Sequence, residues 1–204
     1  MPNQLRVLVA AVIVFGGGSE TGRAWADPAP TVTVLVDDQA RLPNRTLEHA
    51  LMIAGGVYRR AGVSVRWLQP SDTVSSDSDL TIVLVSAAAA VTFRTGDDSM
   101  GVARAINGRR NTAYVFYDRV RDFGEHGHID GWIVLGCAIA HELGHLLLPV
   151  NAHTRDGIMR AGWDPRFLVR ERLPTFEPDQ ARLLRLRVAS RESSATTGAN
   201  RYHE

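Results

Sequence analysis

The sequence has a single cysteine and no lysine, and the first of these gaps limits how the fold can be stabilised. Because Cys137 has no second cysteine to pair with, an internal disulfide bond is excluded. A hydrophobic core or a bound metal must therefore supply the stability of the fold. All basic residues are arginine, and nothing in the sequence gives this bias a function.

The chain also lacks an excess of charge and a membrane-spanning hydrophobic run. Loss of residues 1–26 would remove Arg6, Glu20 and Arg23, and so bring the formal charge from +1 to zero. A neutral chain gives no indication of binding to nucleic acid or to an anionic membrane surface. The apolar run at residues 7–15 is too short to span a bilayer comfortably.

The first 26 residues have the pattern of a secretory signal peptide. Arg6 precedes the apolar run, glycines follow it, and Ala24-Trp25-Ala26 forms a small-x-small cleavage site. We predict a mature chain that begins at Asp27, is secreted or periplasmic, and makes no membrane contact after cleavage. No cysteine lies near the cleavage site, so we expect no lipid attachment there. We also expect no folded pro-domain, because few residues separate Asp27 from the first predicted strand.

Residues 27–189 suit one domain that can bury a sizeable core. Hydrophobic periodicity and turn residues predict its first half: strands at 31–36, 63–68 and 80–85, a helix at 45–60, and a loop with at most one helical turn at 87–100. The run at 80–85 (LTIVLV) is largely apolar, which is typical of a central strand buried on both faces. His49 falls in the helix, where we expect it at the surface or the edge of the core.

The second half begins with a hairpin signal, Asn107-Gly108, between predicted strands at 101–106 and 112–120. Residues 122–128 carry His126 and His128, and we predict a polar loop there rather than a second metal site. Asp130 is placed to cap a helix over residues 131–148. The remaining predictions are a turn-rich stretch at 160–176, a helix beginning at Pro178, and a disordered tail at 190–204.

The 131–148 helix carries the sequence His141-Glu142-Leu143-Gly144-His145. Two histidines four residues apart on a helix project from the same face, and both can reach one zinc ion at roughly 2.1 Å. Glu142 lies beside the first histidine and can act on a water molecule instead of the metal. The pattern therefore predicts a zinc site with Glu142 as the catalytic residue.

A third ligand must come from the segment after Pro149, because proline cannot continue the helix. Asn151, His153 and Asp156 are the alternatives. We favour His153, since a neutral amide is a poor zinc ligand and imidazole is a good one. Cys137 lies about 12 Å along the helix from His145, too far to share one tetrahedral ion, and is predicted to be a buried core thiol.

The order of these elements and the residues from His141 to Met159 resemble the metzincin clan of zinc peptidases. The resemblance covers most of the mature chain in topology but is specific only over residues 141–159. It implies an α+β fold with a twisted, mixed and mostly parallel sheet of about five strands, an antiparallel edge hairpin, an active-site helix, a methionine turn and a C-terminal helix. The chain departs from the clan pattern at Leu148 and Asn151, which replace a glycine and the third histidine, and at Arg160, which replaces a tyrosine.

The resemblance implies an exported zinc metalloendopeptidase, a hydrolase that cleaves peptide bonds with water activated by Glu142. His141, His145 and His153 would hold Zn2+ with Met159 beneath it, and a peptide or protein substrate would lie along residues 101–106. We expect a monomer. A second hypothesis is a weak or inactive zinc-stabilised binding or inhibitory protein, although a structural zinc site has no use for Glu142. A third is a hydrolase of non-peptide substrates.

Overall fold

The computed structural model describes residues 28–72, 80–93, 95–96, 99–106, 109–171 and 173–199. The predicted signal peptide, the Asn107-Gly108 turn, most of the loop before residue 80, and residues 200–204 lie outside the described residues. None of the helices in the described ranges is long and apolar enough to cross a membrane.

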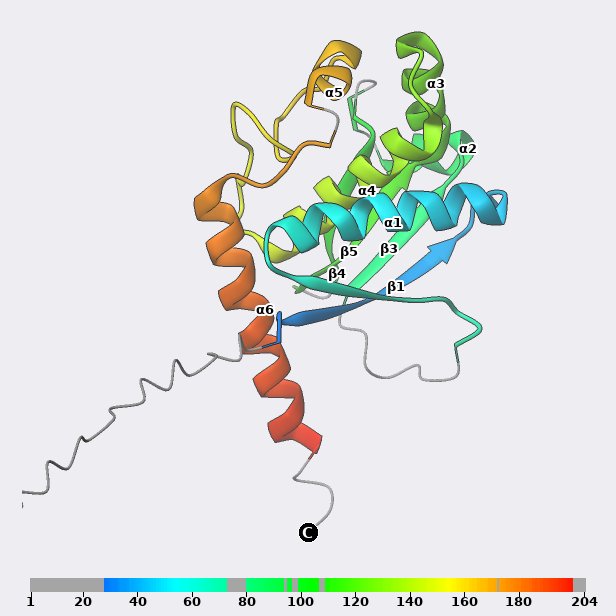
Figure 1. The fold of residues 1–204 in the computed structure, drawn as a ribbon. Helices are drawn as coiled ribbons and strands as arrows, with labels where there is room; N and C mark the ends of the chain where they lie inside the picture. The colour runs from blue at the N-terminus through cyan, green and yellow to red at the C-terminus, as the bar shows by residue number, and fades with distance from the viewer. Residues whose placement is uncertain are drawn as a thin grey trace, which may run out of the picture.

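A five-stranded sheet forms the centre of the fold (Figure 1). Its strands are β1 (Thr31–Asp38), β2 (Ser64–Leu68), β3 (Leu80–Val85), β4 (Gly101–Ile106) and β5 (Arg109–Phe116). They lie in the order β2-β1-β3-β5-β4. All neighbours are parallel except β4, which pairs with β5 in an antiparallel hairpin at the edge. The predicted fold class, α+β with a mostly parallel sheet and an antiparallel edge hairpin, is confirmed.

Alternation along β3 divides the core into two parts, because successive strand residues point to opposite faces. Ile82 and Leu84 belong to the main core, whereas Val83 and Val85 belong to a smaller cluster on the other face. The main core lies under helices α1 (Asn44–Arg60) and α4 (Gly131–Leu147), which cover one face of the sheet (Figure 1). The smaller cluster packs on the turns α2 (Ala87–Ala90) and η1 (Val91–Phe93).

Helices α1 and α4 hold each other at close range. The Tyr58 hydroxyl of α1 donates a hydrogen bond to the Ala140 carbonyl of α4, at 3.2 Å. At the crossing, a Cβ added at Gly136 would lie only 2.6 Å from the Ala50 carbonyl oxygen. Cys137 is fully buried in this layer, and burial raises the pKa of its thiol to about 12. Its side chain therefore stays protonated in the core, as predicted for a buried core thiol.

The segment after β5 differs from the prediction. Residues 117–120 are not strand, and residues 122–128 are not a polar loop: helix α3 spans Tyr117–Gly127. Its buried residues, Val120 and Gly124, lie four apart on one face, which is helical spacing. On the solvent side Arg121 contacts Asp118 and Glu125, three and four residues away, and contacts at this spacing stabilise an exposed helix. The aromatic and β-branched residues at the start of α3 suggested a longer strand.

Two further differences lie near the C-terminus. The turn-rich stretch contains helix α5 (Pro165–Glu171), whose first turn is capped when the Asp164 carboxylate accepts a 2.9 Å bond from the Phe167 amide. Helix α6 spans Pro178–Ala199, so residues 190–199 are helical where a disordered tail was predicted. Glu192 in this part accepts a 2.8 Å bond from the Thr31 amide and so ties α6 to β1.

Candidate metal centre

Helix α4 carries the first part of the site and ends where Pro149 requires. The last helical residue is Leu147, and the Leu148 amide donates a 2.8 Å bond to the Gly144 carbonyl. Leu148 itself has extended geometry, with ψ 165°, because a residue before proline is pushed out of the helical region. His141, Glu142 and His145 therefore lie in the last two turns of a rigid, buried helix.

The chain turns back towards α4 at Asn151. This residue has φ +65°, a left-handed conformation that asparagine tolerates better than most residues. Gln180 of α6 fixes the next residue by donating a 2.7 Å bond to the Ala152 carbonyl. The turn from Pro149 to Ala152 brings His153 back to the two helix histidines.

Three imidazole nitrogens meet at this point. His145 Nε2 lies 3.1 Å from His141 Nε2 and 3.1 Å from His153 Nε2. The single hydrogen of a neutral His145 Nε2 can serve only one of these two neighbours. A cation among the three nitrogens would satisfy all of them, and tetrahedral zinc sets its nitrogen ligands about 3.4 Å apart. Within the described ranges this is the one cluster of histidine, cysteine or acidic side chains that could hold a metal ion.

A backbone carbonyl determines the tautomer of His141. Its Nδ1–H donates a 2.8 Å hydrogen bond to the Ile158 carbonyl, which leaves the Nε2 lone pair directed at the cluster. Burial lowers the pKa of His141 to about 4 and outweighs the opposite effect of the hydrogen bond to Ile158. The ring is therefore neutral at pH 7, the form that binds a metal.

The turn before Met159 contacts the cluster through the Ile158 carbonyl, which bonds His141. Gly157 has φ +76°, and the Ile158 amide donates a 2.8 Å bond to the Thr175 carbonyl, so the Ile158 carbonyl can face His141. Met159 is fully buried. A Cβ added at Gly144 would lie 2.5 Å from the Met159 sulfur, so the absence of a side chain at Gly144 lets the thioether pack against α4 at this residue.

Glu142 is a buried carboxyl group without a counter-charge among the described residues. Its side chain is 6% exposed, and its Oε2 atom has no hydrogen-bond partner within the described residues. Burial raises the pKa of Glu142 to about 8. Gly101 of β4 makes room for it, because an added Cβ would lie 2.7 Å from the Glu142 carboxyl carbon. An unpartnered carboxyl beside three converging imidazoles is suited to a water molecule and a cation.

A cleft of about 860 Å3 opens over the cluster. The start of β4, the His153 turn and residues 160–163 are among the segments that line it. Trp163 packs edge-on against His141, with ring centroids 5.5 Å apart. β4 is the outermost strand of the sheet, as predicted, so its free edge borders the cleft. The cleft can therefore hold an extended chain beside the three histidines.

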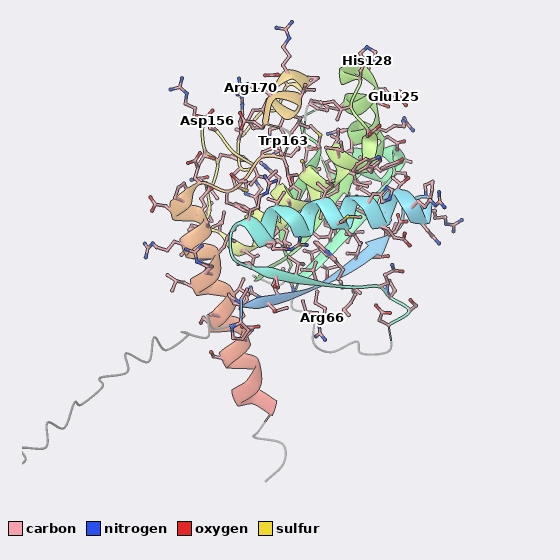
Figure 2. All side chains as sticks on the ribbon, viewed as in Figure 1. Arg66, Glu125, His128, Asp156, Trp163 and Arg170 are labelled. Carbon is pink, nitrogen blue, oxygen red and sulfur yellow. The ribbon has the colours of Figure 1, made fainter. Side chains whose placement is uncertain are left out.

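The structure separates the three alternatives for the third ligand. His153 joins the cluster, Asn151 occupies the turn, and Asp156 is an exposed residue on the far part of the loop (Figure 2). Within this loop the Thr154 hydroxyl donates a 2.7 Å hydrogen bond to the Asp156 carbonyl.

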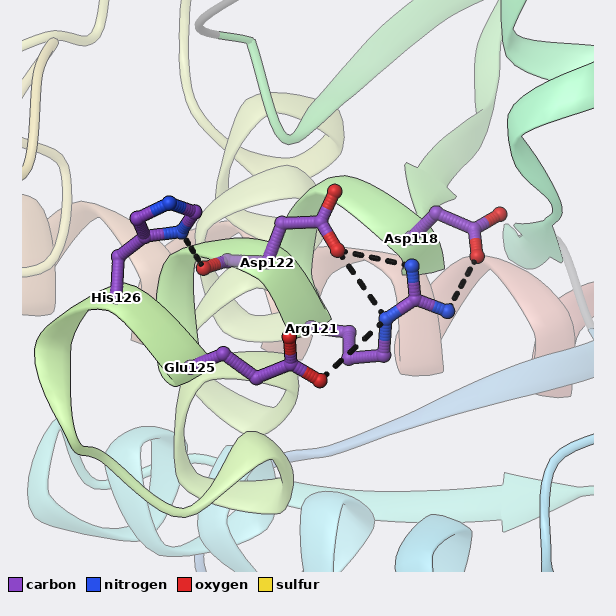
Figure 3. Close-up of polar contacts among 5 residues, drawn as sticks. All are labelled: Asp118, Arg121, Asp122, Glu125 and His126. Carbon is purple, nitrogen blue, oxygen red and sulfur yellow. Dashed lines mark hydrogen bonds and ion pairs between the residues drawn. The ribbon is translucent and has the colours of Figure 1, made fainter.

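His126 lies on α3 and His128 directly after it, and both are outside the cluster. The Nδ1–H of His126 donates to the Asp122 carbonyl at 2.6 Å, and Arg121 draws together Asp118, Asp122 and Glu125 (Figure 3). His128 has φ +52° and ends α3. His126 and His128 therefore belong to the salt-bridged surface at the end of α3.

Several residues of the site are missed by sequence reasoning. Gly101, Gly144 and Trp163 act through tertiary contacts, and the Ile158 carbonyl is a backbone group. Gln180 lies 28 residues from the carbonyl that it fixes. No local pattern reports such contacts. The position of Gly144 between the two histidines was visible in the sequence, but its contact partner Met159 was not.

Comparison with known proteins finds a resemblance among solved structures only. No family model matches the chain, and no curated protein matches it. Among solved structures, the fold is similar to that of metalloproteinase-II from Bacteroides fragilis, with a TM-score of 0.49 and 12% sequence identity. The match covers 80% of this chain and 55% of that one, so the chain spans about half the length of that protein.

Proposed function

We propose that the protein is an exported zinc-dependent metallopeptidase. The observation that carries the proposal is the meeting of three imidazole nitrogens beside the buried, unpartnered carboxyl of Glu142 at the base of a cleft. The donor set is that of a catalytic zinc site, which has three protein ligands and one open position. A structural site would use a fourth protein ligand and would not need Glu142.

In this proposal His141, His145 and His153 hold the metal, and Met159 packs beneath them. Zinc, when bound, supplies a Lewis acid that acidifies water and polarises the scissile carbonyl. In its ionised form Glu142 would accept the proton of the attacking water and deliver it to the leaving amine as the C–N bond breaks. The small residue at Gly101 keeps the carboxyl in reach of the cleft.

The substrate would lie as an added strand along β4. The free edge of β4 offers backbone donors and acceptors to an extended peptide, and main-chain hydrogen bonds of this kind do not depend on side chains. Val102 and Ala103 are small enough to leave the edge accessible beside the histidines. Substrate choice would then come from the other lining segments, the His153 turn and residues 160–163.

Zinc content and cleavage of a diverse peptide library, measured together on the purified mature protein, test the proposal. We expect about one zinc per chain and cleavage that a chelator abolishes and added zinc restores. A protein that binds zinc but cleaves no peptide would contradict the proposal. That result would favour a zinc-stabilised binding or inhibitory protein, a reading consistent with the absence of tyrosine from the described lining of the cleft.

Export is a separate proposal, based on the Ala24-Trp25-Ala26 pattern. Mass spectrometry of the protein from the periplasm or culture medium should find a chain that begins at Asp27. Replacement of Ala24 and Ala26 by bulky residues should block cleavage and leave an unprocessed precursor. An intact chain that retains Met1 and stays in the cytoplasm would contradict export without bearing on the metal site.

A further inference from the structure

Arg160 lies at a fixed point in the wall of the cleft, directly after the buried Met159. Thr154 and Arg160 form a parallel β-bridge, and the Thr154 amide donates a 3.0 Å bond to the Met159 carbonyl. The backbone of Arg160 is therefore tied to the loop that carries His153. Two residues earlier, Ile158 holds His141. The position of Arg160 relative to two of the three histidines is thus set by short backbone links.

The guanidinium of Arg160 has a defined place but no strong ionic partner. It lies 5.0 Å over the Phe167 ring, a cation–π contact that orients the side chain. The carboxylate of Asp164 is 3.9 Å away, and the two side chains are 33% and 56% exposed. A surface ion pair of that length contributes little to stability and is easily exchanged. Arg160 can therefore turn to a second carboxylate in the cleft.

The other charged side chains along the cleft are engaged elsewhere. Arg119 donates to the Ser99 and Gly96 carbonyls at 2.7 and 2.8 Å, and so fixes the loop before β4. The Asp122 carboxylate accepts bonds from Arg121 at 2.8 and 3.1 Å, so the guanidinium of Arg121 already balances its negative charge. Glu142 lies at the base, beside the histidines. Among the described residues that line the cleft, Arg160 is the cation left to attract a ligand, and only the weak contact with Asp164 offsets its charge.

We propose that Arg160 forms a carboxylate-binding subsite that selects acidic peptides, with an aspartate or glutamate side chain or a free C-terminus near the cleavage point. The inference rests on the proposed function and names its substrate class. A guanidinium presents paired N–H donors that match a carboxylate in two parallel hydrogen bonds. The aromatic support of Phe167 holds that fork in place before the ligand arrives.

The test uses one peptide library of diverse sequence, prepared with free and with amidated C-termini. Cleavage by the zinc-loaded enzyme gives residue preferences around the cut. Capture by the immobilised, zinc-loaded Glu142→Gln protein gives binding preferences without turnover. Both are repeated with Arg160→Glu, with the neutral Arg160→Met, and with Arg166→Glu, an exposed arginine on α5 outside the cleft. Zinc content is measured for every protein.

We expect acidic peptides to be favoured by about tenfold in cleavage and capture, as for a charge-assisted hydrogen bond at a partly exposed site. Arg160→Met should remove the preference and Arg160→Glu reverse it, whereas Arg166→Glu should keep it, all with unchanged zinc. Preference that persists after amidation identifies side-chain carboxylates, and preference that disappears identifies the C-terminus.

The outcomes separate this inference from the proposed function. Cleavage with the same residue preference in the wild type and in Arg160→Met would overturn the subsite and leave the peptidase standing. Capture of acidic peptides that depends on Arg160, without any cleavage, would retain the subsite and overturn the peptidase. If the protein shows no cleavage and no capture of acidic peptides, both the subsite and the peptidase would be overturned.

Discussion

Replacement of Glu142 by glutamine is expected to leave zinc content and fold unchanged and to lower kcat by about 10²–10⁴-fold, the usual contribution of a general base. Glutamine keeps the volume that packs against Gly101, whereas alanine would leave a hole there. The amide cannot accept a proton from water at neutral pH. The loss should therefore fall on kcat, with little change in KM.

The measurement is steady-state cleavage of one defined peptide by zinc-loaded protein, with metal analysis and circular dichroism on the same samples. Glu48→Gln is the matched control, since Glu48 is an exposed glutamate of α1 outside the cleft over the histidines. Loss of zinc in the Glu142 variant would make Glu142 a ligand and the assigned roles wrong. Equal rates in the variant and the wild type would place the activity at another site.

The sequence predicts those segments whose structure depends on residues close to them in the chain. The central strand β3 can be predicted because burial on both faces requires a mostly apolar run, and five of its six residues are apolar. The end of α4 is readable because Pro149 forbids its continuation. The spacing of His141 and His145 places both rings on one face of the helix whatever surrounds it.

Helix α3 was not predicted because its two signals conflict. Tyr117 and Val120 favour a strand when considered locally, and they continue the pattern of β5. The contacts of Arg121 with Asp118 and Glu125, three and four residues away, indicate a helix, and these contacts prevail together with burial of Val120. Charge spacing would have been the better guide in this segment.

The last turns of α6 were missed for a different reason. Residues 190–199 carry few apolar side chains, which favours disorder in an isolated segment. The structure adds a helix already docked through Leu184 and Val188, and a bond from Thr31 to Glu192. Continuing an existing helix avoids the cost of nucleation, so a weakly apolar extension can remain helical.

Replacement of His153 by alanine is expected to remove the metal or to weaken its binding by more than about a hundredfold, since loss of a direct ligand should exceed the loss caused by an outer-shell partner. Two protein ligands hold a catalytic zinc poorly. His153 is exposed, so its loss should not disturb the core. The fold should therefore survive while zinc and peptide cleavage are lost together.

Asn151→Gly and Asp156→Ala complete the comparison, because they alter the two rejected ligands. Glycine keeps the left-handed turn that Asn151 provides at φ +65°, so metal content should stay nearly unchanged. The Asp156 side chain is outside the cluster, and its removal should at most loosen the turn before Met159. Zinc retained after dialysis against a competing chelator decides among the three variants. Full zinc in His153→Ala, with loss in either of the others, would contradict the assignment, because the third ligand would then come from the turn itself rather than from the imidazole that the turn brings back to α4.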